Sequence, residues 1–410
     1  MRLHPFRALR PAPVPGLAAR ISSPPYDVVN RAEATRIAAA NPVSFIRVGR
    51  AEVDLPESVD PYDPKVYRQA RANLDRMLAE GLLIQEESPS LYLYRLVMEG
   101  RTQTGVVGCV HIDDYGNDMI RKHEKTRQDK EDDRTRHVRA LNANAEPVFL
   151  AHRANPVIER LPVVETPAPP LYDFTADDGV RHTLWRVRHP NAWVEAFRSI
   201  DTLYVADGHH RSASAWRAGT ELRAARPGST GEEEFNWFLA VIFPADQLRI
   251  LPYNRLVKDL RGLTAAQFLE RLPRLGRLVI DADPAPPRPG TFAIYIEGRW
   301  YLLESAESAI DRRDPIGSLD VSLLQDRILS PLLGIGDPRV DSRIDFVGGI
   351  RGTAELEKRV KSGEAALAVS MYPTTMDQLL AVADAGGIMP PKSTWFEPKL
   401  RSGLVVHRLE

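Results

Sequence analysis

The segment LYVADGHHRSASAW, residues 203–216, holds the residues whose types and spacing are best suited to bind an anion. Its apolar start predicts a strand, Asp207 and Gly208 predict a turn, and a helix is expected over about 209–218. The first turn of a helix presents unpaired backbone N–H groups, and Gly208 lets a phosphate approach them closely. We therefore predict a phosphate site that also uses three following side chains: His209, His210 and Arg211.

Two roles are open for the aspartate of this turn. Asp207 can cap the helix or hold a divalent cation such as Mg²⁺ beside the phosphate. The imidazoles of His209 and His210 project about 100° apart on a helix, so they are not expected to share one metal ion. The structural alternative is an ordinary Asp-Gly turn, in which Asp207 is only an N-cap and both histidines are plain polar residues.

A second segment, RKHEKTRQDKEDDRTRH at residues 121–137, contains no apolar residue. A helix or strand here has no apolar stripe to bury, so one interpretation is a solvated charged segment. The other is that Glu124 lies over a cleft and accepts a proton from a hydroxyl nucleophile. In that case four neighbours would contact the nucleotide and its phosphates: Arg121, His123, Lys125 and Arg134.

The third segment is MPPKSTWFEPK, residues 389–399. Read from Gly386, it has the spacing G-x-x-x-x-G-K-[ST] except that Pro391 replaces the second glycine. Because proline has no N–H, this is not a nucleotide-binding loop of that type. Three polar residues after the prolines are candidate anion contacts: Lys392, Ser393 and Thr394. The alternative is a structural turn anchored by the aromatic residues that follow.

Helices and strands alternate around these segments. Helices are expected over 30–40, where Asn30 and Glu33 form a capping box, and over 64–83, 191–199, 319–333, 353–361 and 376–385. Strands are expected over 91–98 and 104–112, joined by a turn at Glu99-Gly100, and over 147–152, 181–188, 237–243, 292–304 (a hairpin) and 365–371. Residues 161–170 and 281–290 are proline-rich and indicate linkers. The alternation predicts an α/β (mixed α+β) fold with lobes at 1–160 and 161–410.

The composition excludes several classes of protein. Of 410 residues, 43% are hydrophobic and 27% charged, and 54 Lys and Arg balance 55 Asp and Glu to a net charge of −1. Nucleic acid and membrane are therefore not expected as partners. The single Cys109, expected in the strand over 104–112, excludes an intrachain disulfide. The start MRLHPFRALRPAPVPG has charges and prolines where a signal peptide would be apolar, which predicts a cytoplasmic protein.

Four motifs together resemble the bacterial and archaeal family known as DUF1015 over nearly the whole chain. They are PPYDV at 24–28, HEKT at 123–126, ADGHHR at 206–211 and MPPKSTWFEPK at 389–399, in the family's order. PPYDV alone indicates proline-stiffened scaffolding. Within the family pattern, Tyr26 and Asp27 become candidate substrate contacts.

The DGHHR turn by itself resembles the phosphate-binding turn of the ParB/sulfiredoxin-like superfamily, which includes free-serine kinases. The resemblance implies a ParB/sulfiredoxin-like nucleotide-binding core with additional N- and C-terminal lobes. It also implies an ATP- or ADP-dependent phosphotransferase acting on a small molecule, with free L-serine as the first acceptor to test. Mg²⁺ would accompany the nucleotide, with Asp207 as its candidate ligand. The candidate catalytic residues are then Glu124, Asp207 and His209.

Two other functions remain open. A non-catalytic regulator would bind a nucleotide at the same turn and act through a partner. A metal-dependent hydrolase would use His123, Glu124, Asp207 and one of the two adjacent histidines.

Overall fold

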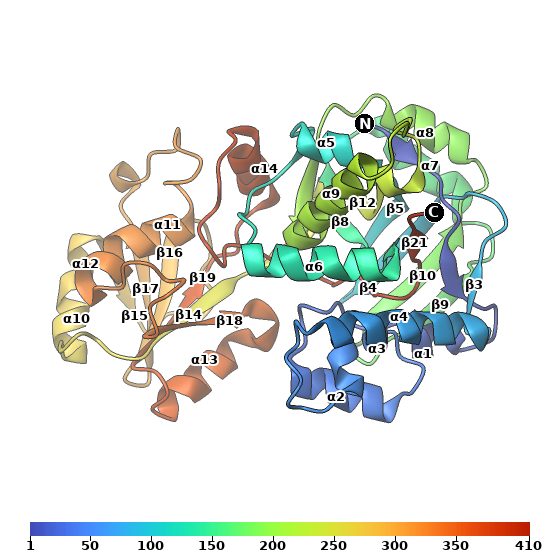
Figure 1. Cartoon of the computed structure of the whole chain (residues 1–410). Coiled ribbons are helices and arrows are strands. Elements are labelled where there is room, and N and C mark those ends of the chain that lie inside the picture. Colours follow the sequence, from blue (N-terminus) through green and yellow to red (C-terminus); the bar gives the residue numbers. More distant parts are fainter. The chain divides into compact units, whose positions relative to one another are not determined.

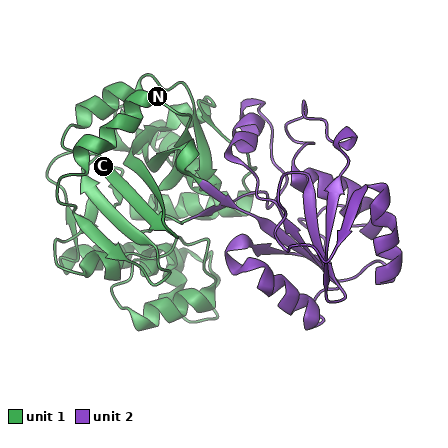
Figure 2. Cartoon of the chain, turned by 180° about the vertical axis from the view of Figure 1, so that it is seen from behind, with its two compact units in different colours: residues 1–248, 398–410 green, residues 249–397 purple.

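The computed structural model describes residues 1–410 and divides into two compact units (Figure 2). Unit 1 comprises Met1–Leu248 and Pro398–Glu410, and unit 2 comprises Arg249–Glu397. The boundary expected between residues 160 and 161 is not a boundary between these units. Strands β8 (Val148–His152) and β11 (Leu203–Asp207), which lie on either side of it, pair in one sheet. The chain instead leaves unit 1 after residue 248 and returns to it at residue 398.

A nine-stranded mixed sheet forms the core of unit 1. Its order is β6-β11-β8-β12-β5-β4-β10-β9, with β1 paired beside β5. The further strands are β1 (Leu3–His4), β4 (Tyr92–Met98), β5 (Arg101–His111), β6 (Ile120–Arg121), β9 (Tyr172–Thr175), β10 (Arg181–Arg186) and β12 (Trp237–Pro244). The pairs β11–β6 and β12–β8 are parallel, and the other pairs are antiparallel. Every residue of β12 is buried, as expected for a central strand with both faces covered.

Helices cover this sheet and build a second apolar core with the N-terminal segment. They are α1 (Leu17–Ile21), α2 (Arg31–Ala40), α3 (Ile46–Gly49), α4 (Pro64–Ala79), α5 (Ile112–Gly116), α6 (Gln128–Leu141), α7 (Pro156–Glu165), α8 (Pro190–Phe197) and α9 (His209–Ala224). Two short sheets pair β2 (Leu9–Pro11) with β3 (Leu83–Gln85), and β7 (Ala143–Asn144) with β21 (His407–Arg408). Helix α6 lies between α9 and α4 (Figure 1).

Local sequence signals predicted several of these elements correctly. The Asn30–Glu33 capping box is present at the start of α2. Glu99 and Gly100, with φ of 50° and 76°, form the turn between β4 and β5. Cys109 is buried in β5 as expected.

The expected linker over 161–170 is wrong in its first half, because α7 continues to Glu165 with Pro162 inside it. Asn155 caps this helix and Pro156 occupies its first turn, a favourable start that proline density concealed. The last residue of the helix, Glu165, is buried. Its carboxylate accepts the backbone N–H groups of Arg188 (2.8 Å) and His189 (3.2 Å).

Unit 2 contains a six-stranded antiparallel sheet in the order β15-β17-β16-β19-β14-β18. Its strands are β14 (Tyr253–Val257), β15 (Gly276–Ile280), β16 (Thr291–Ile296), β17 (Arg299–Ser305), β18 (Ile344–Gly348) and β19 (Leu367–Met371), and β13 (Arg249–Leu251) pairs separately with β20 (Trp395–Glu397). Its helices are α10 (Ala265–Arg271), α11 (Asp320–Leu324), α12 (Ser330–Leu333), α13 (Gly352–Lys361) and α14 (Met376–Asp384). The mixed α/β class is thus confirmed. None of the helices combines the length and apolar character that a membrane span needs.

Candidate functional site

The predicted strand–turn–helix is present at the start of α9. Gly208 is the N-cap residue, with φ of 96°, and no side chain caps the helix. Asp207 is therefore not the N-cap, and the corresponding alternative is wrong. A Cβ at position 208 would lie 3.0 Å from Nε of Arg211, so glycine is required here by both conformation and space. No N-cap side chain accepts a hydrogen bond from the N–H groups of the first turn of α9.

Asp207 lies between two cations. Its Oδ2 accepts a hydrogen bond from Nζ of Lys399 at 3.0 Å, and its Oδ1 lies 3.7 Å from Nη2 of Arg211. Burial alone would raise the pKa of Asp207, but Lys399 and Arg211 outweigh it and hold that pKa well below its usual value. Because both oxygens face cations, Asp207 does not fit the predicted role of magnesium ligand.

The His, Cys, Asp and Glu side chains form no group of three that could hold a metal ion. The residues expected for a metal-dependent hydrolase are therefore not arranged as a metal site. Magnesium at this turn would have to rely on oxygen atoms of a bound nucleotide.

The polar segment before α6 meets the start of α9, although about eighty residues separate them in the sequence. Oε2 of Glu124 lies 3.8 Å from Nδ1 of His209. The backbone N–H of His123 points at Nε2 of His209, 3.5 Å away, and the two rings meet edge to face at 4.4 Å. Since Nε2 faces a donor, the proton of a neutral His209 belongs on Nδ1, the atom that faces Glu124.

Both of these histidines are buried. Burial, with a smaller effect of His123, lowers the pKa of His209 well below its usual value. Burial likewise lowers the pKa of His123 to about 4. Both rings are therefore neutral near pH 7. Neither ring nitrogen of His123 makes a hydrogen bond of normal length, and a weaker contact with the backbone of Val205 partly opposes the effect of burial on its pKa.

His210 attaches the polar segment to α9. Its Nε2 accepts the backbone N–H of Arg127, the N-cap residue of α6, at 3.1 Å. Lys125 is exposed on the same segment, and Arg121 lies half-buried in β6, in register with Tyr204 of β11. His210 thus serves at least one structural role that the sequence did not indicate.

Most of the buried residues of helix α6 are polar. Arg134 is buried, donates to Oδ2 of Asp133 at 2.9 Å, and lies 4.1 Å from the centre of the Tyr26 ring. The hydroxyl of Tyr67 donates to Oδ1 of Asp133 at 2.9 Å. The predicted phosphate contact Arg134 and the predicted substrate contact Tyr26 therefore pack against each other in the interior.

Asp27 and Arg211 connect the PPYDV motif to the same site. Oδ2 of the exposed Asp27 lies 3.7 Å from Nη2 of Arg211, which also donates from Nη1 to the carbonyl of Pro147 at 2.6 Å. Arg211 is buried, and its Nε has no partner. Behind it lies a cavity of about 30 Å³, lined in part by Arg134 and Glu146, which has room for about one water molecule.

Two functional neighbours were missed at the sequence level. Buried Glu146 accepts the backbone N–H of Tyr26 at 3.2 Å and the hydroxyl of Ser402 at 3.0 Å, and burial raises its pKa. Lys399 is the last residue of the MPPKSTWFEPK motif, but its type and position in the sequence did not indicate a role in the site. Ser402 and Lys399 both belong to the returning C-terminal segment.

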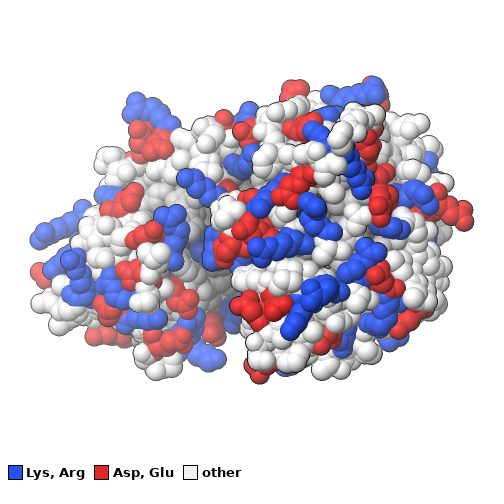
Figure 3. All heavy atoms as spheres, viewed as in Figure 1, with Lys and Arg blue, Asp and Glu red and all other residues white.

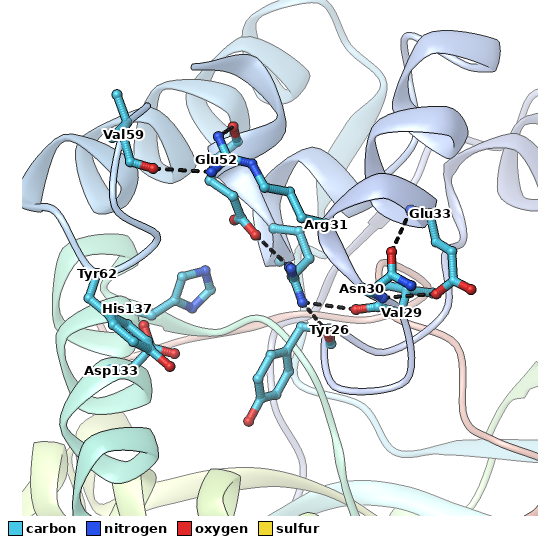
Figure 4. A network of polar contacts seen from close by, with 12 residues as sticks. Tyr26, Val29, Asn30, Arg31, Glu33, Glu52, Val59, Tyr62, Asp133 and His137 are labelled. Carbon is cyan, nitrogen blue, oxygen red and sulfur yellow. Dashed lines mark hydrogen bonds and ion pairs between the residues drawn. The ribbon is translucent and has the colours of Figure 1, made fainter. Parts of the chain in front are cut away.

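A network of polar contacts fixes the PPYDV loop (Figure 4). Arg50 donates to the carbonyl oxygens of Tyr26 at 3.0 Å and Val29 at 2.9 Å. Arg31 donates to the carbonyl of Val59 at 3.1 Å. These contacts hold the loop that presents Asp27.

The remaining predicted anion contacts lie in unit 2: Lys392, Ser393 and Thr394. The carbonyl of Lys392 accepts from Nη2 of Arg255 at 3.1 Å, and its Nζ lies 5.3 Å from the centre of the Tyr253 ring. The Ser393 hydroxyl donates to the carbonyl of Pro390 at 2.5 Å. These contacts make a turn held within unit 2.

The chain belongs to the family described as a protein of unknown function (DUF1015), whose model matches residues 3–322. No curated protein matches the sequence. Similar solved structures include a free serine kinase in complex with AMP, at 15% identity over 73% of this chain and 92% of that chain, with a TM-score of 0.33. A conserved hypothetical protein from Pyrococcus furiosus has 15% identity over 74% and 95%, with a TM-score of 0.35. SbnI with a C-terminal truncation, from Staphylococcus aureus, has 12% identity over 73% and 87%, with a TM-score of 0.38.

Proposed function

We propose that this protein is a nucleotide-dependent kinase of a small hydroxyl metabolite, with free L-serine as the first acceptor to test. The observation that carries the proposal is the meeting of Glu124 with the uncapped start of α9, where Oε2 lies 3.8 Å from Nδ1 of His209. A carboxylate beside an anion-binding helix end supplies the two parts that phosphoryl transfer to an alcohol needs.

The nucleotide phosphates bind on the outer side of the turn. The cavity behind Arg211 has about 30 Å³ and is far too small for a diphosphate or triphosphate. On the outer side, the first N–H groups of α9 attract negative charge, and Gly208 adds no side chain of its own there. Arg211 and Lys399 add positive charge at the same place, next to Asp207.

Glu124 is the general base of the proposed reaction. The acceptor hydroxyl oxygen attacks the terminal phosphorus, its proton passes to the Glu124 carboxylate, and the bond between that phosphorus and the leaving oxygen of the nucleotide breaks. His209 is a positioning residue, because its neutral ring directs Nδ1–H towards Glu124. His210 holds the segment of Glu124 against α9 through its bond to Arg127.

Serine is chosen as the acceptor because the DGHHR turn resembles that of free-serine kinases. The same resemblance leaves ATP and ADP both open as donors. The exposed Asp27, fixed by the loop contacts of Tyr26 and Val29, is the proposed contact for the acceptor amino group.

The test is formation of O-phosphoserine from L-serine, Mg²⁺ and either ATP or ADP by the purified chain. Glu124→Gln should lower turnover by about 10²–10⁴-fold, the usual contribution of a general base, and leave nucleotide affinity unchanged. Glu87→Gln is the matched control, because Glu87 is exposed and lies in the turn before β4, away from α9. A folded wild-type protein that forms no phosphoserine with either nucleotide would reject the serine assignment. Nucleotide binding without turnover on any alcohol would favour the regulator.

A further inference from the structure

Unit 1 has a second polar depression, distinct from the start of α9. It has a volume of about 570 Å³ and is formed by the side chains of α4, α6 and α9. Its lining residues are Pro64, Tyr67, Arg68, Asp132, Thr135, Arg136, Arg139, Ala140, Arg217 and Glu221. On the face shown in Figure 3, Lys and Arg side chains alternate with Asp and Glu over this region of α6. None of the lining residues was assigned a function by the sequence motifs.

The depression has an excess of positive charge. Its two carboxylates are already paired: Arg217 contacts Asp132 at 2.5 Å, and Arg139 contacts Glu221 at 2.6 Å. Arg68 and Arg136 are both exposed at the depression, and Arg136 also interacts with the Tyr67 hydroxyl and with the Asp132 carboxylate. Four arginines and two carboxylates line the depression, so its lining side chains carry a net positive charge.

The floor of the depression contains an unsatisfied hydroxyl. Thr135 is only 4% exposed, and its Oγ1 has no hydrogen-bond partner. A buried hydroxyl without a partner is unfavourable, so a ligand atom that bonds to it is favoured. Beside it, the Tyr67 hydroxyl is fixed by its bond to Asp133.

We propose that this depression binds a small phosphorylated metabolite. The planar guanidinium groups of Arg68 and Arg136 match the oxygen geometry of a phosphate, and Thr135 supplies a neutral contact below them. The volume lies within the range of about 300–1,000 Å³ that is usual for small-molecule sites. This site goes beyond the proposed kinase function and does not depend on it.

The test is calorimetric titration of the full chain with sodium pyrophosphate at constant ionic strength. Arg68→Gln/Arg136→Gln should weaken the binding at least tenfold, and it should fold normally because both arginines are exposed. The matched control is Arg198→Gln/Arg313→Gln, which also removes two exposed arginines. Arg198 lies at the end of α8, and Arg313 lies in unit 2. Equal isotherms for the two double variants would overturn the proposal, since any binding at the start of α9 is common to both.

A second variant separates a built site from general attraction of anions. Thr135→Val keeps the shape and the charge of the depression but removes the unpartnered hydroxyl. It should weaken pyrophosphate binding by about threefold or more, whereas general electrostatic attraction predicts no change. Unchanged affinity in Thr135→Val would place the pyrophosphate outside this depression and overturn the assignment.

Discussion

Nζ of Lys399 lies 3.0 Å from Oδ2 of Asp207, although 192 residues separate them in the sequence. The pair joins the C-terminal segment, which returns to unit 1 after unit 2, to the turn that precedes α9. Ser402 continues the same attachment through its bond to Glu146. The proposed phosphate site is thus completed by the last thirteen residues of the chain, residues 398–410.

Replacing Lys399 should destabilise unit 1. In Lys399→Met, the Asp207 carboxylate keeps only Arg211, at 3.7 Å, as a neighbouring cation. Losing one partner of a largely buried ion pair leaves an uncompensated charge, and we expect the free energy of unfolding to fall by about 2 kcal/mol at pH 7. Urea unfolding followed by circular dichroism measures it. The pKa of Asp207 should rise in the variant, since Lys399 is the largest of the effects that lower it.

The matched control is Asp207→Asn/Lys399→Met, which removes both charges and should be more stable than Lys399→Met alone. The pH dependence has a definite sign. Because the folded pKa of Asp207 lies below the ordinary value of about 4, the pair stabilises the wild type above that pH and this contribution is lost as the pH falls further. Equal stability of single and double variants at pH 7 would contradict the role of the pair.

Substitution of Gly208 should lower the free energy of unfolding by more than the backbone conformation alone explains. Gly208→Ala places an L-residue at φ of 96° and a Cβ at 3.0 Å from Nε of Arg211. Gly228→Ala is the matched control, because Gly228 has φ of 91° and open space around its Cβ. We expect the free energy of unfolding to fall by about 1 kcal/mol in the control and by about 1 kcal/mol more in Gly208→Ala. Thermal unfolding measures both values. Nucleotide affinity should fall only in Gly208→Ala, and an equal effect of both changes would contradict the close contact with Arg211.

The accuracy of the sequence predictions followed the range of the interactions. The capping box of Asn30 and Glu33 and the turn at Glu99 depend on residues three or fewer apart, and both were predicted. The pair of Asp207 and Lys399 depends on where the chain returns after unit 2, and no local pattern encodes that. The return of the chain to unit 1 at residue 398 depends on long-range contacts of the same kind.

Helix α6 shows a second limit of sequence patterns. Hydrophobic periodicity detects a buried helix only when the buried face is apolar, and residues 121–137 contain no apolar residue. The buried face of α6 instead begins with polar side chains, and the apolar Val138 and Leu141 follow only in its last turn. Arg134 pairs with Asp133, and His137 bonds to the carbonyl of Val48 at 2.8 Å. Residue types alone identified the candidate Glu124, but its contact with His209 required the fold.

Protonation of buried His123 should destabilise the protein on mild acidification. Its pKa is about 4 in the folded state and about 6.5 when unfolded, so between these values the unfolded chain binds more protons. The free energy of unfolding should therefore fall as the pH drops from 7 to 4, by up to about 1.4 kcal/mol per pH unit from this group. In His123→Phe the slope should decrease by about one proton, because the titrating ring is removed. Denaturant unfolding at several pH values gives the slope, and an unchanged slope would contradict the assignment.

Unit 2 should respond to pH in the opposite direction through Asp320. Burial raises the pKa of this carboxyl to about 7, and its Oδ1 accepts the backbone N–H of Gly290 at 2.7 Å. The folded state therefore binds more protons than the unfolded state between about pH 4 and 7, so this group destabilises unit 2 as the pH rises through that range. Asp320→Asn retains the acceptor oxygen without the charge, so amides of β16 and β19 should exchange more slowly than in the wild type at pH 8, by about tenfold or more.

Asp283→Asn is the matched control, because the exposed Asp283 likewise accepts a backbone N–H, that of Ala285, at 2.7 Å. Hydrogen exchange followed by mass spectrometry measures the difference, and equal exchange rates in both variants would show that the buried carboxyl does not limit the stability of unit 2.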